Sequence, residues 1–90
     1  MIVLMDLEWV ENRFRHATPT QLAALRVDEA WEPVSMFESL CRPRDESFYQ
    51  WKHVAYAGAS EREFLFAPPA RVVFERFLGW LRADDNLAVL

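Results

Sequence analysis

The sequence predicts an α/β domain in which three strands are followed by an amphipathic helix and a fourth strand. The apolar run Ile2–Met5 is typical of a strand that is buried on both faces. Apolar residues recur at helical spacing between Pro68 and Arg82, which indicates a helix with one buried side. With 90 residues, 52% of them hydrophobic, the chain has the material for one core and one domain over residues 1–90.

Three strands are expected in the first half of the chain. The first is predicted over Met1–Trp9, and the polar, basic segment Trp9–Thr20 is predicted as a loop. The second strand is predicted over Gln21–Val27 and the third over Val34–Arg42, with a polar turn over Asp28–Pro33. Because the connections are short, the three strands should form an antiparallel meander.

Two short helical segments are expected next. Asp45 or Ser47 could cap a short helix that runs through Val54. Ser60 and Glu63 have the spacing of a capping box, in which the serine and glutamate side chains satisfy each other's backbone N–H groups.

The last elements are a helix and a strand. The helix is predicted over Pro68–Arg82, and Leu87–Leu90 should open a fourth strand. One apolar stripe is expected along the helix, formed by Val73, Phe74, Phe77, Leu78 and Leu81. A strand that follows a helix returns parallel to an earlier strand by a right-handed crossover, and Leu87–Leu90 is expected to pair parallel to the first strand. We therefore expect an incomplete α/β domain, with the chain ending at a core strand.

The charge of the chain limits how it could meet nucleic acid. The formal net charge is −4 and the isoelectric point is about 5.1. A protein that holds nucleic acid mainly through phosphate contacts usually carries a basic stripe, which this sequence lacks. Metal ions that bridge carboxylates to a phosphate are the expected route. The small basic loop with Arg13, Arg15 and His16 could meet a phosphate, but a solvated loop is the favoured interpretation.

The single cysteine and the absence of targeting signals indicate a cytoplasmic protein. Cys41 has no partner for an intrachain disulfide, which fits a reducing compartment, and its apolar neighbours predict a buried, inert thiol. Met1–Met5 lacks the basic region of a signal peptide. No stretch approaches the roughly 20 apolar residues of a membrane span, so no membrane partner is expected.

Asp6 and Glu8 are the residues most suited to chemistry. They are two apart on the predicted first strand, so their side chains should share one face, with Cα atoms about 6.5–7 Å apart. Carboxylate oxygens are the ligands that Mg²⁺ and Mn²⁺ prefer, and two carboxylates so placed could hold one metal or a pair. A buried strand rarely ends in two acids unless something neutralises them.

The stretch Ile2–Trp9, which reads Ile-Val-Leu-Met-Asp-Leu-Glu-Trp, resembles the first motif of the DEDD-type (DEDDh-like) 3′–5′ exonucleases. The fold of that family is RNase H-like. The resemblance continues through Pro19–Asp28 and Phe37–Pro43, the places of the second and third strands, and through Ala67–Leu81, the helix before the second motif. It covers the N-terminal half of such a domain, and only the first motif is specific.

The resemblance implies a partial RNase H-like fold and a site for two-metal hydrolysis at a nucleic acid 3′ end. Asp6 and Glu8 would be catalytic and would bind two divalent metal ions, Mg²⁺ or Mn²⁺. Leu7 and Trp9 would contact the substrate, with Trp9 near the terminal nucleotide. The remaining motifs would follow Leu90, so the 90-residue chain is expected to be inactive by itself.

Two other interpretations stay open. The chain could be a non-catalytic RNase H-like module that binds a partner through its open sheet edge, and the unpaired fourth strand could also lead to self-association. It could instead be a small structural domain in which the two acids are coincidental. The aromatic residues Trp31, Trp51 and Trp80 are interpreted as core or edge packing, and His53 as a packed or surface histidine.

Overall fold

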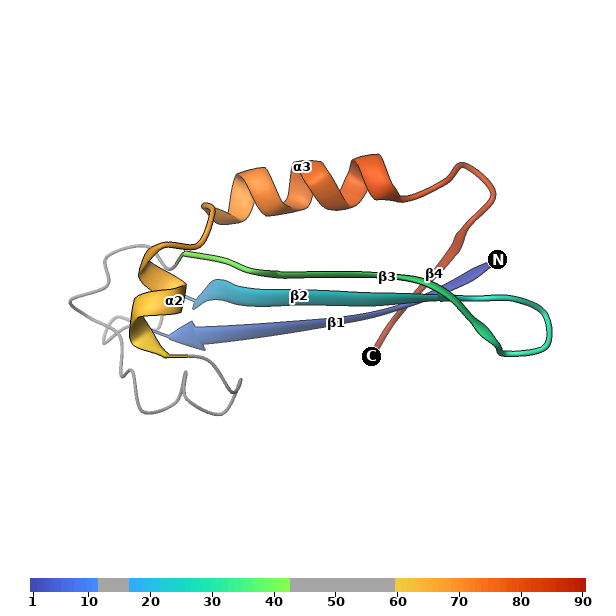
Figure 1. Cartoon of the computed structure of the whole chain (residues 1–90), viewed down its shortest axis with the longest axis horizontal. Helices are drawn as coiled ribbons and strands as arrows, with labels where there is room; N and C mark the ends of the chain where they lie inside the picture. Colours follow the sequence, from blue (N-terminus) through green and yellow to red (C-terminus); the bar gives the residue numbers. More distant parts are fainter. Residues whose placement is uncertain (12–16, 43–59) are drawn as a thin grey trace.

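The computed structural model describes residues 1–11, 17–42 and 60–90. They form a four-stranded sheet with one long helix packed on one face (Figure 1). The elements in chain order are β1 (Ile2–Glu11), β2 (Ala17–Val27), β3 (Pro33–Leu40), α2 (Glu61–Leu65), α3 (Ala70–Trp80) and β4 (Asn86–Val89).

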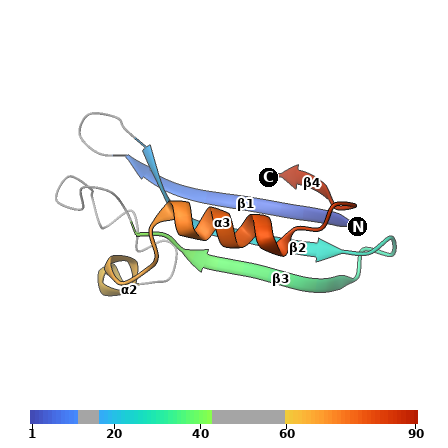
Figure 2. The ribbon, with the colours of Figure 1, turned by 90° about the horizontal axis from the view of Figure 1, so that it is seen from above.

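The strand order is β3-β2-β1-β4, so β1 and β2 are the inner strands. β1 and β2 pair antiparallel, as do β2 and β3, which confirms the predicted meander. β4 runs parallel to β1, with Ile2 opposite Asn86 and Met5 opposite Val89. Seen from above, α3 lies along the sheet and β4 lies beside the start of β1 (Figure 2). The expected strand-strand-strand-helix-strand order is therefore confirmed.

The first two strands are longer than predicted, so the expected loop Trp9–Thr20 is wrong at both ends. Val10 pairs with Thr18, and both side chains are buried. A β-bulge between Glu8 and Trp9 shifts the register before these residues pair. Such a bulge accommodates Pro19, which has no N–H to donate to a regular ladder. The polar composition of Trp9–Thr20 predicted a loop, but β1 continues to Glu11 and β2 begins at Ala17.

The predicted capping box is confirmed at the start of α2. The Ser60 hydroxyl accepts a hydrogen bond from the Glu63 backbone N–H at 3.3 Å, and the Glu63 carboxylate accepts one from the Ser60 N–H at 3.1 Å. These bonds satisfy two donors that a helix start leaves without partners. The other expected short helix, from Asp45 or Ser47 through Val54, lies outside the described residues.

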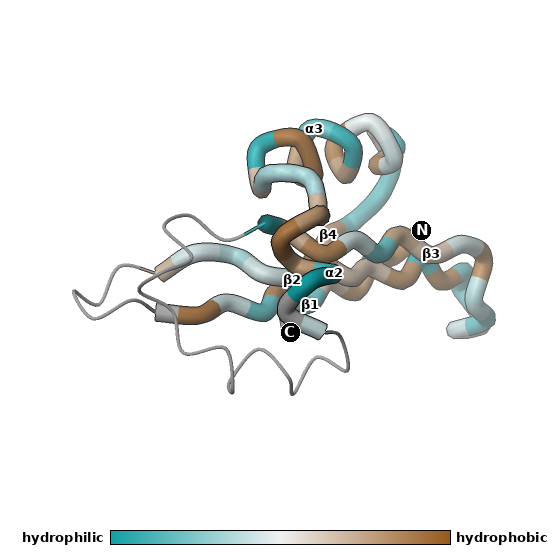
Figure 3. Tube along the Cα trace, turned by 60° about the vertical axis from the view of Figure 1, so that its left-hand side comes forward, coloured by the Kyte–Doolittle hydropathy of each residue, from teal (hydrophilic) through white to brown (hydrophobic). Residues whose placement is uncertain are grey.

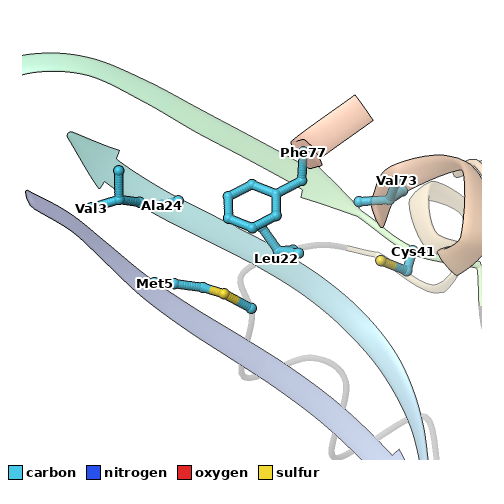
Figure 4. Close-up of a cluster of buried hydrophobic side chains, with 7 residues drawn as sticks. All are labelled: Val3, Met5, Leu22, Ala24, Cys41, Val73 and Phe77. Atoms are coloured by element: carbon cyan, nitrogen blue, oxygen red, sulfur yellow. The ribbon is translucent and has the colours of Figure 1, made fainter. Parts of the chain in front are cut away.

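The core lies between α3 and the sheet. Val73 and Phe77 are the buried residues of α3, and Phe77 points down towards Leu22 on β2 (Figure 4). The cluster is formed by Val3, Met5, Leu22, Ala24, Cys41, Val73 and Phe77, with Phe74 and Leu81 among the partly buried residues around it. Hydrophobic residues recur along the strands and along α3 (Figure 3). The predicted packing of this helix on the sheet is confirmed.

The apolar stripe of α3 is narrower than predicted. Leu78 is 66% exposed, whereas Phe77 is 3% exposed. Adjacent residues on a helix are rotated by about 100°, so Leu78 cannot face the sheet when Phe77 does. At the end of the helix, the rings of Phe37, Phe77 and Trp80 form a cluster with centroids 5.5–6.0 Å apart. Trp80 therefore packs as predicted, whereas Trp31 is 64% exposed and belongs to no core.

A buried ion pair joins β2 to the segment between α3 and β4. The Arg26 guanidinium, 2% exposed, donates to the Asp85 carboxylate at 2.9 Å, and Asp85 is 3% exposed. Arg26 also donates to the Ser35 hydroxyl and to the Trp80 carbonyl oxygen, both at 2.7 Å, and lies 4.0 Å above the Trp80 ring. The Arg82 backbone N–H donates to the same carboxylate at 2.9 Å. Every charged group at this junction is thus paired.

In the part of the chain that the structure describes, no helix is both long enough and apolar enough to cross a membrane.

The core predicts a clear difference between two phenylalanines. Phe77→Ala should lower the free energy of unfolding by about 3–5 kcal/mol, because it removes a buried ring and leaves a cavity under α3. Phe66→Ala should change that free energy by less than about 0.5 kcal/mol, because its ring is 79% exposed. Urea unfolding followed by circular dichroism measures both. Equal losses in the two variants would contradict the described core.

The ion pair predicts how acid affects stability. The Arg26 hydrogen bond, helped by the Arg82 backbone N–H, holds the pKa of the Asp85 carboxyl below its ordinary value. A carboxyl with a lowered pKa stabilises the fold above its unfolded pKa, and this stabilisation is lost as the pH falls through the folded pKa. The stability difference between the wild type and Asp85→Asn should therefore be full at pH 6 and should shrink below about pH 4. Urea unfolding of both proteins at pH 6 and pH 3 measures it, and a pH-independent difference would refute the assignment.

Candidate metal site on the open face of the sheet

Strand β1 places both predicted ligands on the face of the sheet that α3 does not cover. The side chains of Met5 and Leu7 contribute to the core under α3, and side chains alternate along a strand. Asp6 and Glu8 therefore point away from the helix, Asp6 opposite Ala23 and Glu8 opposite Gln21. They lie in the middle of β1, because the strand continues to Glu11 rather than ending at the acids as the sequence suggested.

Both carboxylates are accessible and free of ion pairs among the described residues. Asp6 and Glu8 are exposed, and no described Lys, Arg or His lies within ion-pair distance of either. The neighbour of Asp6 across the ladder is Ala23, whose small side chain leaves the carboxylate uncovered on that side. Two same-face carboxylates with Cα atoms about 6.5–7 Å apart present several oxygen ligands to one approaching cation.

Two polar residues of the neighbouring strands share this face, and the sequence did not single them out. Gln21 lies directly opposite Glu8, and its side-chain amide donates to the Glu38 carboxylate at 2.9 Å. Glu38 is paired with Ala23, which is paired with Asp6, so Glu38 lies in the row of Asp6 two strands away. Their Cα atoms are about 10 Å apart. Only the pairing register places Glu38 near the site.

The two predicted substrate contacts occupy different surroundings. Leu7 is half-buried and packs against the core, so its side chain lies on the face opposite the carboxylates. Only its backbone lies between Asp6 and Glu8. Trp9 follows the β-bulge and is 58% exposed. By the alternation along β1, its side chain leaves the strand on the face of Leu7, one residue after Glu8. An exposed indole is available for stacking with a ligand.

The end of β4 reaches the site, and the acids before β4 do not. The Leu90 backbone N–H donates to the Met5 carbonyl oxygen at 2.8 Å, which brings the end of the chain beside Asp6. Asp85 lies at the start of β4 and is bound to Arg26. Within the described residues, no group of three or more His, Cys, Asp or Glu side chains is close enough to hold a metal. The pair Asp6 and Glu8 is therefore the donor set to consider.

The remaining sequence candidates fall into two groups. The basic loop Arg13–His16 and the residues Trp51 and His53 lie outside the described residues. Cys41 is fully buried, and burial raises the pKa of its thiol to about 11. A buried thiol of this kind stays protonated at neutral pH, which confirms the prediction that it is inert.

No protein-family model matches the sequence, and no curated protein matches it. Solved structures do. The chain is similar to the nuclease domain of 3′hExo, a DEDDh family member solved bound to rAMP, at 12% identity and a TM-score of 0.77, over 98% of this chain and 49% of that one. It is similar to the cell-death related nuclease 4 (CRN-4) at 17% identity and a TM-score of 0.72, over 97% of this chain and 34% of that one.

A third similar structure is E. coli Exonuclease I in complex with a 5cy-dT13 oligonucleotide, at 19% identity and a TM-score of 0.67. That alignment covers 98% of this chain and 19% of the other. The chain therefore spans about half of the 3′hExo nuclease domain and less of the other two proteins. These likenesses show the fold: a mixed α/β sheet of the RNase H-like exonuclease type, with the fourth strand parallel to the first. The fold class expected from the sequence is confirmed.

Proposed function

We propose that this chain is the N-terminal part of a single 3′–5′ exonuclease domain, which hydrolyses phosphodiester bonds at the 3′ end of a nucleic acid. The observation that carries the proposal is the pair of exposed, same-face carboxylates on inner strand β1. Asp6 and Glu8 lie on β1 of a fold similar to the nuclease domain of 3′hExo, which supports the resemblance of Ile2–Trp9 to the first exonuclease motif.

The donor set suits hard divalent cations. Asp6 and Glu8 would hold two ions, Mg²⁺ or Mn²⁺, through carboxylate oxygens. Such ions, when bound, activate water and stabilise the leaving oxygen of a phosphodiester. The net charge of −4 supports this route, because an acidic protein needs a cation between its carboxylates and a phosphate.

The contribution of the chain itself is to hold the two carboxylates in place. Ile2–Met5 of β1 are paired on both sides, with β2 and with β4, and β1 stays paired with β2 through Asp6 and Glu8. Val3 and Met5 pack in the core under α3. A strand anchored in this way keeps Asp6 and Glu8 at a fixed spacing, which a two-metal site requires.

The substrate contacts proposed for Leu7 and Trp9 differ in kind. The exposed indole of Trp9 would stack on the terminal base. Leu7 would contribute its backbone N–H or carbonyl, because its side chain packs towards the core. The similar structures were solved with a ribonucleotide, rAMP, and with a deoxyribonucleotide, 5cy-dT13, so the proposed substrate class is a nucleic acid 3′ end of either sugar.

The cellular setting and assembly are also proposals. The lone buried Cys41 supports a reducing, cytoplasmic compartment. β4 pairs with β1 on one side, and all four of its residues are exposed. Self-association through the other edge of β4 therefore stays a prediction.

Metal binding tests the proposed site directly. Mn²⁺ titrated into the ¹⁵N-labelled protein should broaden the amide signals of Asp6–Glu8 and of their ladder neighbours Ala23 and Gln21. Asp6→Ala should weaken Mn²⁺ binding by at least about ten-fold, because one carboxylate of the pair is lost. Glu75→Ala, which removes an exposed carboxylate from α3, is the matched control and should bind as the wild type does. Uniform weak broadening that Asp6→Ala leaves unchanged would favour the non-catalytic module.

Activity of the 90-residue chain is a separate test. Incubated with a labelled single-stranded oligonucleotide and Mn²⁺, the chain should leave the 3′ end intact. Among the described residues, the two carboxylates offer too few ligands for a two-metal displacement, and no further group beside them would activate the water. Ribose and deoxyribose oligonucleotides should behave alike. Stepwise shortening from the 3′ end, abolished by Asp6→Ala, would show that the chain is active by itself.

A further inference from the structure

The hairpin between β2 and β3 exposes three large apolar side chains within six residues. Trp31 is 64% exposed, Val34 is 45% exposed and Met36 is 65% exposed. Val34 and Met36 are two apart on β3, so they share one face of the strand. We call Trp31, Val34 and Met36 the hairpin surface. Single exposed apolar residues are ordinary, whereas several that are close together in the chain are a candidate surface for another molecule to cover.

The backbone at Trp31 is held in a conformation that does not suit a tryptophan. Its φ is 61°, in the left-handed region, where glycine is favoured. The turn is fixed by the Asp28 side chain, which accepts hydrogen bonds from the Ala30 N–H at 2.9 Å and the Glu32 N–H at 3.0 Å. The Trp31 N–H donates to the Asp28 carbonyl oxygen at 3.0 Å. Because the Trp31 ring is exposed, its packing adds little to the stability of the fold and does not offset the strain of the backbone.

Acidic side chains predominate around the hairpin surface, although the N-terminal ammonium of Met1, 4.0 Å from the Asp85 carboxylate, also lies at this end of the sheet. Residues 27–40 contain four acids, Asp28, Glu29, Glu32 and Glu38, and no Lys, Arg or His. Three of these acids, Asp28, Glu29 and Glu32, lie in the turn, whereas Glu38 lies further along β3, where it accepts a hydrogen bond from Gln21. A recess beside the turn is lined by Met1, Asp28, Glu29, Ala30 and Asp84, which adds a further carboxylate. The surface therefore carries a negative potential around an apolar centre.

We propose that the hairpin surface is a docking site for an extended protein segment that combines apolar side chains with Lys or Arg. Val34, Met36 and the Trp31 indole would contact the apolar side chains, and the surrounding carboxylates would attract the basic ones. β3 is the edge strand of the sheet, so a segment lying along it meets open backbone groups as well. Nucleic acid is a poor occupant, because its phosphates would face the four carboxylates without a cation.

The docking site is separate from the carboxylate pair on β1. The hairpin turn adjoins the start of β1, where Val27 pairs with Ile2. Asp6 lies four residues further along β1, about 13 Å away along the strand. A partner could therefore be held at the hairpin while Asp6 and Glu8 stay accessible. The proposal does not rest on the exonuclease function.

The test measures binding of a fluorescein-labelled peptide of about eight residues that alternates Lys and Val. A peptide that alternates Glu and Val is the matched probe. By fluorescence anisotropy, the Lys/Val peptide should bind the full 90-residue chain and the Glu/Val peptide should not. Binding should weaken with added salt, because the attraction is partly electrostatic.

Three variants locate the binding. Trp31→Gly should weaken it about ten-fold, and the protein should stay folded because glycine adopts the observed φ without a clash. Met36→Lys should weaken it by a similar factor by adding a like charge to an exposed position. Phe66→Ala removes an exposed aromatic from the end of α2 and should leave binding unchanged.

Several outcomes would overturn the proposal. The first is that the two peptides bind the wild type equally. The second is that Trp31→Gly and Met36→Lys both bind the Lys/Val peptide with wild-type affinity. The third is that the wild type prefers a single-stranded oligonucleotide to the Lys/Val peptide and that Trp31→Gly removes this preference. Sedimentation that shows a dimer in the wild type and a monomer in Trp31→Gly would assign the surface to a second copy instead. None of these outcomes depends on Mn²⁺ binding at Asp6, so the two proposals fail separately.

Discussion

The buried guanidinium of Arg26 organises the whole sheet. A charge removed from water must be paired, and Arg26 on β2 satisfies this requirement with Asp85 before β4, the Ser35 hydroxyl on β3 and the Trp80 carbonyl at the end of α3. One side chain thus connects three strands and the helix. Asp85 in turn accepts the Arg82 N–H, which fixes the turn that leads into β4. Together with the backbone hydrogen bonds between β4 and β1, this junction fixes the register of β4.

That register determines what lies around the candidate site. β4 begins opposite Ile2, and its last backbone bond, from Leu90 to Met5, ends beside Asp6. β1 is therefore paired on both edges for its first residues and covered by α3 on one face. Asp6 and Glu8 lie on its free face, with room above Ala23 and with Gln21 as a polar neighbour. The same packing that buries Met5 makes the two carboxylates accessible.

The two faces of the sheet have different physical roles. The covered face carries the apolar cluster and the aromatic rings of Phe37, Phe77 and Trp80, which account for the stability of the fold. The other face has no helix over it within the described residues, and it presents the carboxylates of β1 and the apolar side chains of Val34 and Met36 on β3. The Asp6 and Glu8 pair suits a phosphate that is bridged by a metal ion. The hairpin surface, which is apolar and has acids around it, suits a basic protein segment.

The sequence by itself determined the order of elements, the capping box and the common face of Asp6 and Glu8, because these follow from local periodicity and from spacings of a few residues. Tertiary structure decided the rest. Arg26 and Asp85 are 59 residues apart, and no local pattern marks them as partners. The proximity of Glu38 to the site depends on strand register, and the exposure of Leu78 depends on the orientation of α3. The extension of the hairpin through Pro19 depended on a bulge. Each of these is set by contacts between distant segments, which a linear pattern does not encode.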